Sequence, residues 1–223
     1  MNALLAILNV FIDPAETVRR IRGNKLAWFP PILVAGILLG IYNLNLAPLT
    51  MQAMRNDPPP GLDPAKLDQM VGAMQFMARF SAISAPVMFA LMTMIGAAVI
   101  FALCVIFQVN LRFPDLYNLV AHVGVINAVQ ATAHLIVLRS KGPNLTMKDV
   151  VPNFGLGLLV GDSVPRFVQG LLIFFSVFTI WHIVALALGV AALGQISKSK
   201  AFLVTAPNWI IGLIFAMIGA MLR

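Results

Sequence analysis

The sequence predicts an all-α, polytopic membrane protein with five transmembrane helices and further amphipathic helices at the membrane surface. Of its 223 residues, 60% are hydrophobic and only 10% are charged, which is far from the balance of a soluble globular domain. The mean hydropathy is +0.92, and long uncharged runs alternate with short connections that carry the charges. Because a helix needs about 20 apolar residues to cross a bilayer, we interpret these runs as spans of one membrane domain covering residues 1–223.

The N-terminal segment is expected to lie at the membrane surface. Residues 2–12 are apolar but too short to span, and no basic segment precedes them, so a cleavable signal peptide is not expected. A helix is expected over residues 14–22. Asp13 suits its N-cap, Pro14 suits its first position, and Glu16 completes a start that resembles a capping box.

Cations gather on this helix and just beyond it. They are Arg19, Arg20, Arg22 and Lys25. Trp28 follows, where an interfacial aromatic residue is expected before the first span. Together with Asp13 and Pro14, these residues form the candidate surface site. Two interpretations stay open: the site contacts lipid headgroups and sets topology, or it docks a protein partner.

The remaining chain divides into spans and connections. The five spans are expected at residues 29–49, 86–109, 116–138, 167–193 and 201–222. A second amphipathic surface helix is expected over 64–80, with Arg79 on its polar side and methionines on the other. The connection 140–166 is expected to be irregular, with Thr146 and Asp149 capping a short turn.

The third span is unusual because it is uncharged but carries a stripe of polar side chains. They are His122, Asn127, Gln130 and His134. At about 100° per residue, the last three fall within about 60° of one another, and His122 lies further round the same side. Unpaired polar groups in hydrocarbon cost several kcal/mol each, so this polar stripe should face other helices or a wet cavity. It is either a set of interhelical hydrogen bonds or a binding site for a lipid headgroup, an ion or a small solute.

No sequence pattern indicates catalysis or cofactor binding. The chain has no His-Glu-x-x-His, no Gly-x-Ser-x-Gly and no phosphate-binding glycine loop. His122 and His134 are about 18 Å apart along one helix, so they cannot share a zinc ion. We therefore expect no catalytic residue, no metal and no cofactor. The net charge of +7 comes from Lys and Arg scattered through short connections, which is typical of headgroup contact and not of nucleic-acid binding.

Short pieces at both ends of the chain match a known family. In chain order they are Phe11, Asp13-Pro14, Thr17, Ile21, Trp28, Pro31, Phe178, Trp181 and Leu188-Gly189. With these pieces and five spans, the chain resembles the Yip family, named for interaction with Ypt/Rab small GTPases. The resemblance implies a cytoplasmic N-terminus, a non-enzymatic role in membrane organisation or trafficking, and oligomers. Eukaryotic members carry a long cytoplasmic N-terminal region that is short here, so the chain looks like a prokaryotic-type member and a Rab partner is not implied.

The sequence thus predicts a non-enzymatic membrane protein that organises membrane or recruits lipid or protein partners. The alternative is a small channel or a lipid or solute transporter that uses the polar stripe. The expected location is the bacterial inner membrane, with the N-terminus in the cytoplasm because the densest basic cluster precedes the first span. Expected partners are membrane lipids; a protein partner or a homo-oligomer stays open, and nucleic acid is not expected.

Overall fold

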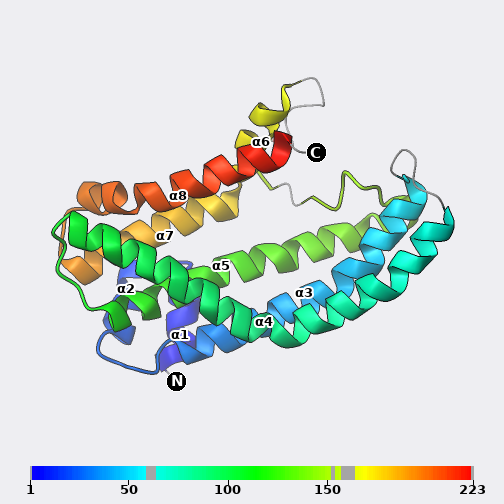
Figure 1. The fold of residues 1–223 in the computed structure, drawn as a ribbon. Coiled ribbons are helices and arrows are strands. Elements are labelled where there is room, and N and C mark those ends of the chain that lie inside the picture. The colour runs from blue at the N-terminus through cyan, green and yellow to red at the C-terminus, as the bar shows by residue number, and fades with distance from the viewer. Residues whose placement is uncertain (1, 59–63, 152–153, 157–163, 222–223) are drawn as a thin grey trace. The chain divides into compact units, whose positions relative to one another are not determined.

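The computed structural model describes residues 2–58, 64–151, 154–156 and 164–221, with the side chains of α1 from residue 5 onward and those of α4 from residue 70 onward (Figure 1). The α-helices are α1 (Asn2–Asn9), α2 (Pro14–Ile21), α3 (Phe29–Asn56), α4 (Pro64–Ile106), α5 (Phe113–Ser140), α6 (Arg166–Phe174), α7 (Val177–Gly194) and α8 (Lys198–Met221). The described residues also include the 3-10 turn η1 (Gly142–Asn144), a 3-10 residue at Leu156 and the isolated bridge Gly155–Ser176. The helices long and apolar enough to cross a membrane are α3, α4 from Met70, α5, α7 and α8. The predicted all-α, five-span class is confirmed.

Helix α4 differs from the sequence prediction. The expected surface helix 64–80 and the expected span 86–109 form one helix of 43 residues, with Pro86 inside it. Proline leaves the carbonyl four residues earlier, that of Ala82, without its helical donor. The backbone of Gly40 in α3 packs against this same carbonyl, since a Cβ built on Gly40 would lie 3.0 Å from the Ala82 oxygen. Close coverage by a neighbouring helix explains why the chain continues through the proline.

The expected fourth span, 167–193, is also different, because it is two helices. α6 ends at Phe174, and Ser176 caps α7 by accepting a hydrogen bond from the Thr179 N–H at 3.0 Å. The Val177 N–H donates to the Phe154 carbonyl at 3.3 Å, so the chain is extended at this point and pairs with a distant segment. Both α6 and α7 contact α8.

The chain groups into two compact units. Unit 1 comprises Met1–Leu33, Ala90–Asn127 and Asn153–Arg223, and unit 2 comprises Val34–Phe89 and Ala128–Pro152. Helices α3, α4 and α5 each continue from one unit into the other without a linker.

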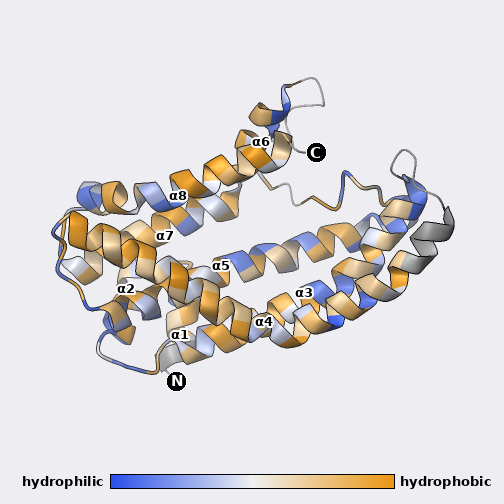
Figure 2. Cartoon of the chain, viewed as in Figure 1, coloured by the Kyte–Doolittle hydropathy of each residue, from blue (hydrophilic) through white to orange (hydrophobic). Residues whose placement is uncertain are grey.

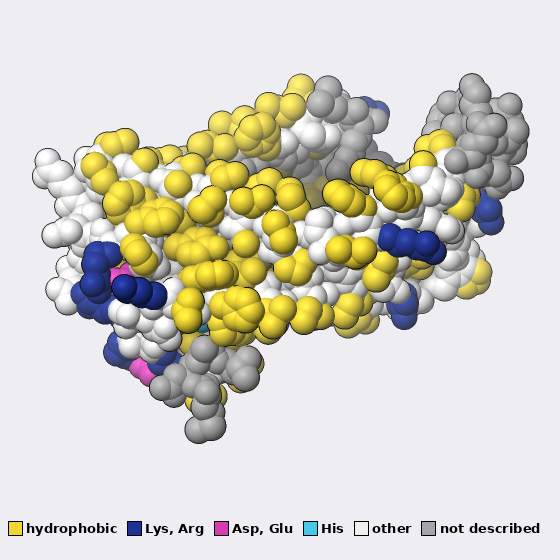
Figure 3. Space-filling view, turned by 60° about the horizontal axis from the view of Figure 1, so that its bottom comes forward, with side chains coloured by type: hydrophobic (Ala, Val, Ile, Leu, Met, Phe, Trp, Pro, Cys, Tyr) yellow, Lys and Arg dark blue, Asp and Glu magenta, His cyan; other side chains and the backbone are white. Residues whose placement is uncertain are grey.

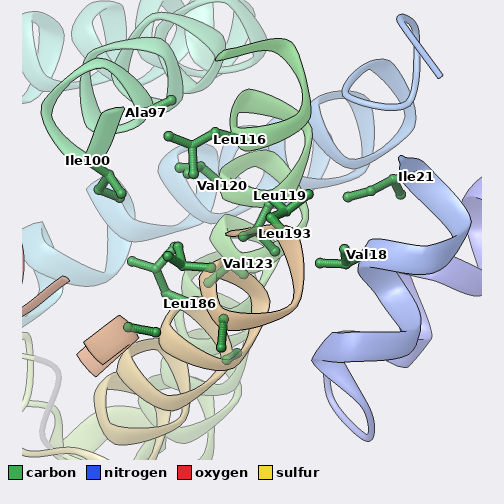
Figure 4. Close-up of a cluster of buried hydrophobic side chains, with 14 of the residues drawn as sticks. Val18, Ile21, Ala97, Ile100, Leu116, Leu119, Val120, Val123, Leu186 and Leu193 are labelled. Atoms are coloured by element: carbon green, nitrogen blue, oxygen red, sulfur yellow. The ribbon is translucent and has the colours of Figure 1, made fainter. Parts of the chain in front are cut away.

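The core of unit 1 lies between α2, α4, α5 and α7 (Figure 4). Leu116, Leu119 and Val123 of α5 are fully buried at its centre. Gly189 lets α7 approach closely, since a Cβ there would lie only 2.4 Å from a methyl carbon of Leu119. Glycine at such a contact is typical of helix packing in membranes.

Unit 2 is held by a second close helix contact and a small core. Gly36 and Gly40 of α3 pack against Pro86 and Ala82 of α4. Near the other end of α3, Ala53 is fully buried beside residues of α5 and the following connection, namely Leu138 and Leu145.

Large apolar side chains remain exposed along the spans. Ile83 is 82% exposed, Ile106 70% and Phe215 69%. Hydrophobic residues dominate α4, α7 and α8 (Figure 2), and many apolar side chains are exposed on the face in Figure 3, where Lys and Arg gather in a few places. Such surfaces suit contact with lipid tails, as expected of an integral membrane protein.

Candidate functional site

Helix α2 begins as its sequence predicts. Asp13 is the N-cap and accepts a hydrogen bond from the Glu16 N–H at 3.0 Å, and Pro14 occupies the first turn. Glu16 then pairs with Arg19 at 2.6 Å and with Arg20 at 2.9 Å. Exposed ion pairs of this kind add about 0–1 kcal/mol to the free energy of unfolding. Their main effect here is to hold two guanidinium groups on the outer face of the helix.

The opposite face of α2 is part of the unit 1 core. Val18 is 2% exposed and Ile21 is 1% exposed, and both point toward Leu119 of α5 (Figure 4). The Thr17 hydroxyl donates to the Ala6 carbonyl at 3.2 Å, which fixes α1 against α2. The apolar stripe of α2 is therefore covered by protein, and its cations point away from the bundle.

Apolar side chains are exposed around these cations. They are Leu5 and Leu8 of α1, Ile12 and Leu26 in the turns on either side of α2, and Phe29 at the start of α3. Arg22 and Lys25 are exposed as well, and the Trp28 ring lies 5.8 Å from the Tyr117 ring. Exposed apolar groups beside exposed cations are typical of segments that lie in the membrane interface.

The turn after α2 is fastened to the first turns of α5. Gly23 adopts φ +76°, and its N–H donates to the Asp115 carboxylate at 2.9 Å. The Asn118 amide donates to the Asn24 carbonyl at 2.7 Å. Asp115 and Asn118 are almost fully buried. Sequence reasoning did not assign either residue to the site, although both lie at the start of the helix whose polar side chains made it unusual.

The polar stripe of the third span does not form one cluster. His122 is fully buried in unit 1, and its Nδ1 lies 2.8 Å from the Asn118 carbonyl oxygen. His134 is 2% exposed and belongs to unit 2. Asn127 is exposed and Gln130 is half-buried. Each imidazole thus has its own local partners, and the two amides lie in more open positions.

His134 joins α3, α5 and the connection that follows α5. The Tyr42 hydroxyl lies 3.0 Å from its Nδ1, and its Nε2 lies 3.3 Å from the Asp149 carbonyl oxygen. A carbonyl only accepts, so Nε2 carries the proton and Nδ1 accepts from Tyr42. This is a complete hydrogen-bonding arrangement for a neutral imidazole.

The Thr146–Asp149 turn forms as predicted. The N–H and hydroxyl of Thr146 donate to Asp149 at 2.9 and 2.8 Å, and Lys141 lies 3.1 Å from the other carboxylate oxygen. Partial burial raises the pKa of Asp149, but the Thr146 donors and Lys141 outweigh it and hold the pKa below its ordinary value. The connection is therefore ordered by an ionised carboxylate.

The family model of the Yip1 domain matches residues 8–219. The chain belongs to the Yip1 domain family. The resemblance in the sequence is thereby confirmed over nearly the whole chain, and this family is generally one of non-enzymatic membrane proteins. No curated protein and no solved structure matches the chain.

The residues that carry the Yip1 resemblance have structural roles in this protein. Asp13 caps α2, Thr17 bonds α1, and Ile21 fills the core. Gly189 makes room for α7 against α5, and Trp181 packs against the same core. These residues therefore belong to the packing of unit 1 that holds α1 and α2. The cations of α2 lie on its opposite, exposed face.

Proposed function

We propose that this Yip1 family protein organises membrane without catalysis, by holding a basic, partly apolar N-terminal surface against lipid headgroups. This surface consists of the exposed cations Arg19, Arg20, Arg22 and Lys25 and the exposed apolar residues Leu8 and Ile12. We infer that it faces the cytoplasm, because clusters of Lys and Arg directly before a first span favour the cytoplasmic side.

One observation carries this proposal. Val18 and Ile21 are buried in the same core as the spanning helices α5 and α7, while the cations of α2 and its following turn are exposed. A headgroup-binding segment on a flexible tail would move independently of the spans. Here the segment is fixed to them, so its contact with lipid acts on the orientation of the unit 1 helices and on the membrane around them.

The charge indicates an anionic surface. Each cation near an anionic leaflet contributes about 1 kcal/mol, so four contribute about 4 kcal/mol at low salt. Asp13 and Glu16 lower this total, and at about 0.1 M salt the attraction extends only about 10 Å from the membrane surface. Leu8 and Ile12, which are 61% and 80% exposed, add apolar burial in the interface.

The proposal is tested by reconstitution into phosphatidylcholine vesicles with and without phosphatidylglycerol. Cryo-electron microscopy would measure vesicle shape, and fluorescent lipid would report clustering around the protein. The variant with Arg19, Arg20, Arg22 and Lys25 replaced by Gln should lose the response seen with anionic vesicles. The control replaces the three arginines by Lys, which keeps the charge, and should retain it. Equal responses from the Gln variant and the wild type would refute the proposal.

A second candidate, a small channel or transporter, is motivated by the two amides of the polar stripe. Asn127 is exposed and Gln130 is half-buried within an otherwise apolar stretch, and such groups in membranes often line wet paths. Replacing both by Leu should abolish solute flux in proteoliposomes if they line a path. A Leu substitution at nearby Ala131 serves as the control, and unchanged flux in the double variant would exclude this path.

A further inference from the structure

Three neighbouring hollows follow the seam between α3 and α4 within unit 2. The first, of about 460 Å³, extends from Gly36 and Pro86 to Leu44 and Arg79. The second, of about 250 Å³, shares Leu44 and Arg79 with the first. The third, of about 360 Å³, shares Pro48 and Gln75 with the second. Because consecutive hollows share lining residues, they form one groove, which we call the α3–α4 groove.

The two ends of the groove differ in polarity. The end near Gly36 is lined almost wholly by apolar side chains, including Ile37, Ile41 and Ile83. At the other end, the polar side chains Gln52, Arg55, Asn56 and Gln75 join apolar ones, among them Met51, Val71 and Met74. Among the described residues that line the groove there is no Asp or Glu. The groove is therefore apolar at one end and cationic toward the other.

The change in polarity follows the expected depth in the membrane. Leu44 lies about 22 Å along α3 from Phe29, and a helix leaves a hydrocarbon layer of about 30 Å after about 20 residues. Leu44 and Ala47 therefore lie within the apolar length of α3, and Gln52 and Asn56 lie beyond it. Asn56 donates at 2.7 Å to the carbonyls of Pro143 and Leu145, which anchors this end of α3.

Arg79 stands where the apolar part of the groove ends. It is exposed, and its neighbours Phe76, Met77 and Phe80 are exposed apolar residues. Among the side chains that the structure describes, none makes an ion pair or hydrogen bond with Arg79. A guanidinium group near hydrocarbon needs an anionic partner, and a phosphate matches its paired N–H donors.

We propose that the α3–α4 groove binds one anionic phospholipid, with its phosphate on Arg79 and an acyl chain along Ile37, Ile41 and Ile83. The glycerol headgroup then lies toward Gln75 and Gln52. A free anion would leave the apolar end unused, and a zwitterionic phospholipid would bring its ammonium group beside arginines, with no Asp or Glu among the described lining residues to pair with it. This site is separate from the N-terminal surface and rests on a different observation.

Native mass spectrometry of the full chain tests this proposal. Protein released from mixed micelles with equal phosphatidylglycerol and phosphatidylcholine should retain one phosphatidylglycerol. Arg79→Gln should weaken that retention about tenfold, because a charge-assisted hydrogen bond is lost, and Arg79→Lys should retain part of it. Ile83→Trp, at a position that is 82% exposed, should lower retention by filling the groove while Arg79 stays in place.

Two further measurements distinguish a bound phospholipid from a free anion and from lipid held at the N-terminal surface. Inorganic phosphate should not displace the lipid, since it lacks the acyl chain. Neutralising Arg19, Arg20, Arg22 and Lys25 should leave the single retained lipid in place, because those residues belong to the N-terminal surface. Unchanged retention in Arg79→Gln, with thermal unfolding like that of the wild type, would overturn the proposal, as would displacement by phosphate.

Discussion

Replacing Asp115 by Ala should release the basic N-terminal segment from the spanning helices. Asp115 is 6% exposed, and its carboxylate accepts hydrogen bonds from the Gly23 N–H at 2.9 Å and from Arg112 at 3.0 Å. The bond from Gly23 involves a charged acceptor and is worth about 1.5–3 kcal/mol. The side chain of Arg112 is 72% exposed, so that pair adds about 0–1 kcal/mol.

Asp115 also lies in the first turn of α5, where a negative charge contributes about 0.3–1 kcal/mol. Together these effects predict a loss of about 2–5 kcal/mol for Asp115→Ala. Asp115→Asn keeps the shape of the side chain and an acceptor oxygen, so it should lose about half as much.

The assay is thermal unfolding in detergent combined with limited trypsin digestion, since Arg22 and Lys25 flank the turn held by Asp115. Cleavage at these two sites should accelerate in Asp115→Ala and less so in Asp115→Asn. Asp57→Asn, a change at an exposed carboxylate outside this joint, is the control. An Asp115→Ala protein that unfolds and is cleaved like the wild type would refute the reasoning.

Three further predictions concern packing and pH. Gly40→Val should destabilise unit 2 by about 1–3 kcal/mol in thermal unfolding, because the new side chain meets the Ala82 carbonyl; an unchanged midpoint would contradict this contact. Gly189→Ala should cost a similar amount, and combining it with Leu119→Ala should cost less than the sum of the two, which a double-mutant cycle measures; strict additivity would argue against the contact. The pKa of Asp149 is lower in the folded than in the unfolded protein. The ionised carboxylate therefore stabilises the folded protein at pH values above the unfolded pKa of about 3.9, and this stabilisation is lost as the pH falls through the folded pKa. Hydrogen exchange of residues 141–150 should therefore increase below about pH 4, and Asp149→Asn should show the faster exchange already at neutral pH; identical acid profiles for the two proteins would contradict the assignment.

The five spans and the start of α2 could be predicted because each depends on local sequence. A long apolar run is enough for a span, and Asp13-Pro14 is enough for a helix start. The break before Ser176 could not be predicted, since it depends on pairing with Phe154, a residue distant in the chain. Residues 171–175, directly before the break, are apolar and contain no proline or glycine that would mark an end.

The continuity of α4 and the division of the polar stripe also depend on tertiary contacts. Pro86 usually breaks a helix, and it is tolerated here because Gly40 covers the freed carbonyl. Helical periodicity places Asn127 and His134 on one side of α5, but burial is decided by what packs there, and of these two only His134 is covered. The α3–α4 groove could not be predicted from the sequence either, because its walls come from two helices.

The depth of residue 12 in the bilayer tests most directly whether the N-terminal surface lies on lipid. Cys104 is the chain's only cysteine and is buried, so a Cys104→Ala background allows a single nitroxide at Ile12→Cys. In phosphatidylglycerol vesicles, the label should be reached by oxygen from the bilayer and protected from a water-soluble paramagnetic reagent, and neutralising the four cations should reduce that protection. A label that the aqueous reagent reaches freely in anionic vesicles would contradict the account.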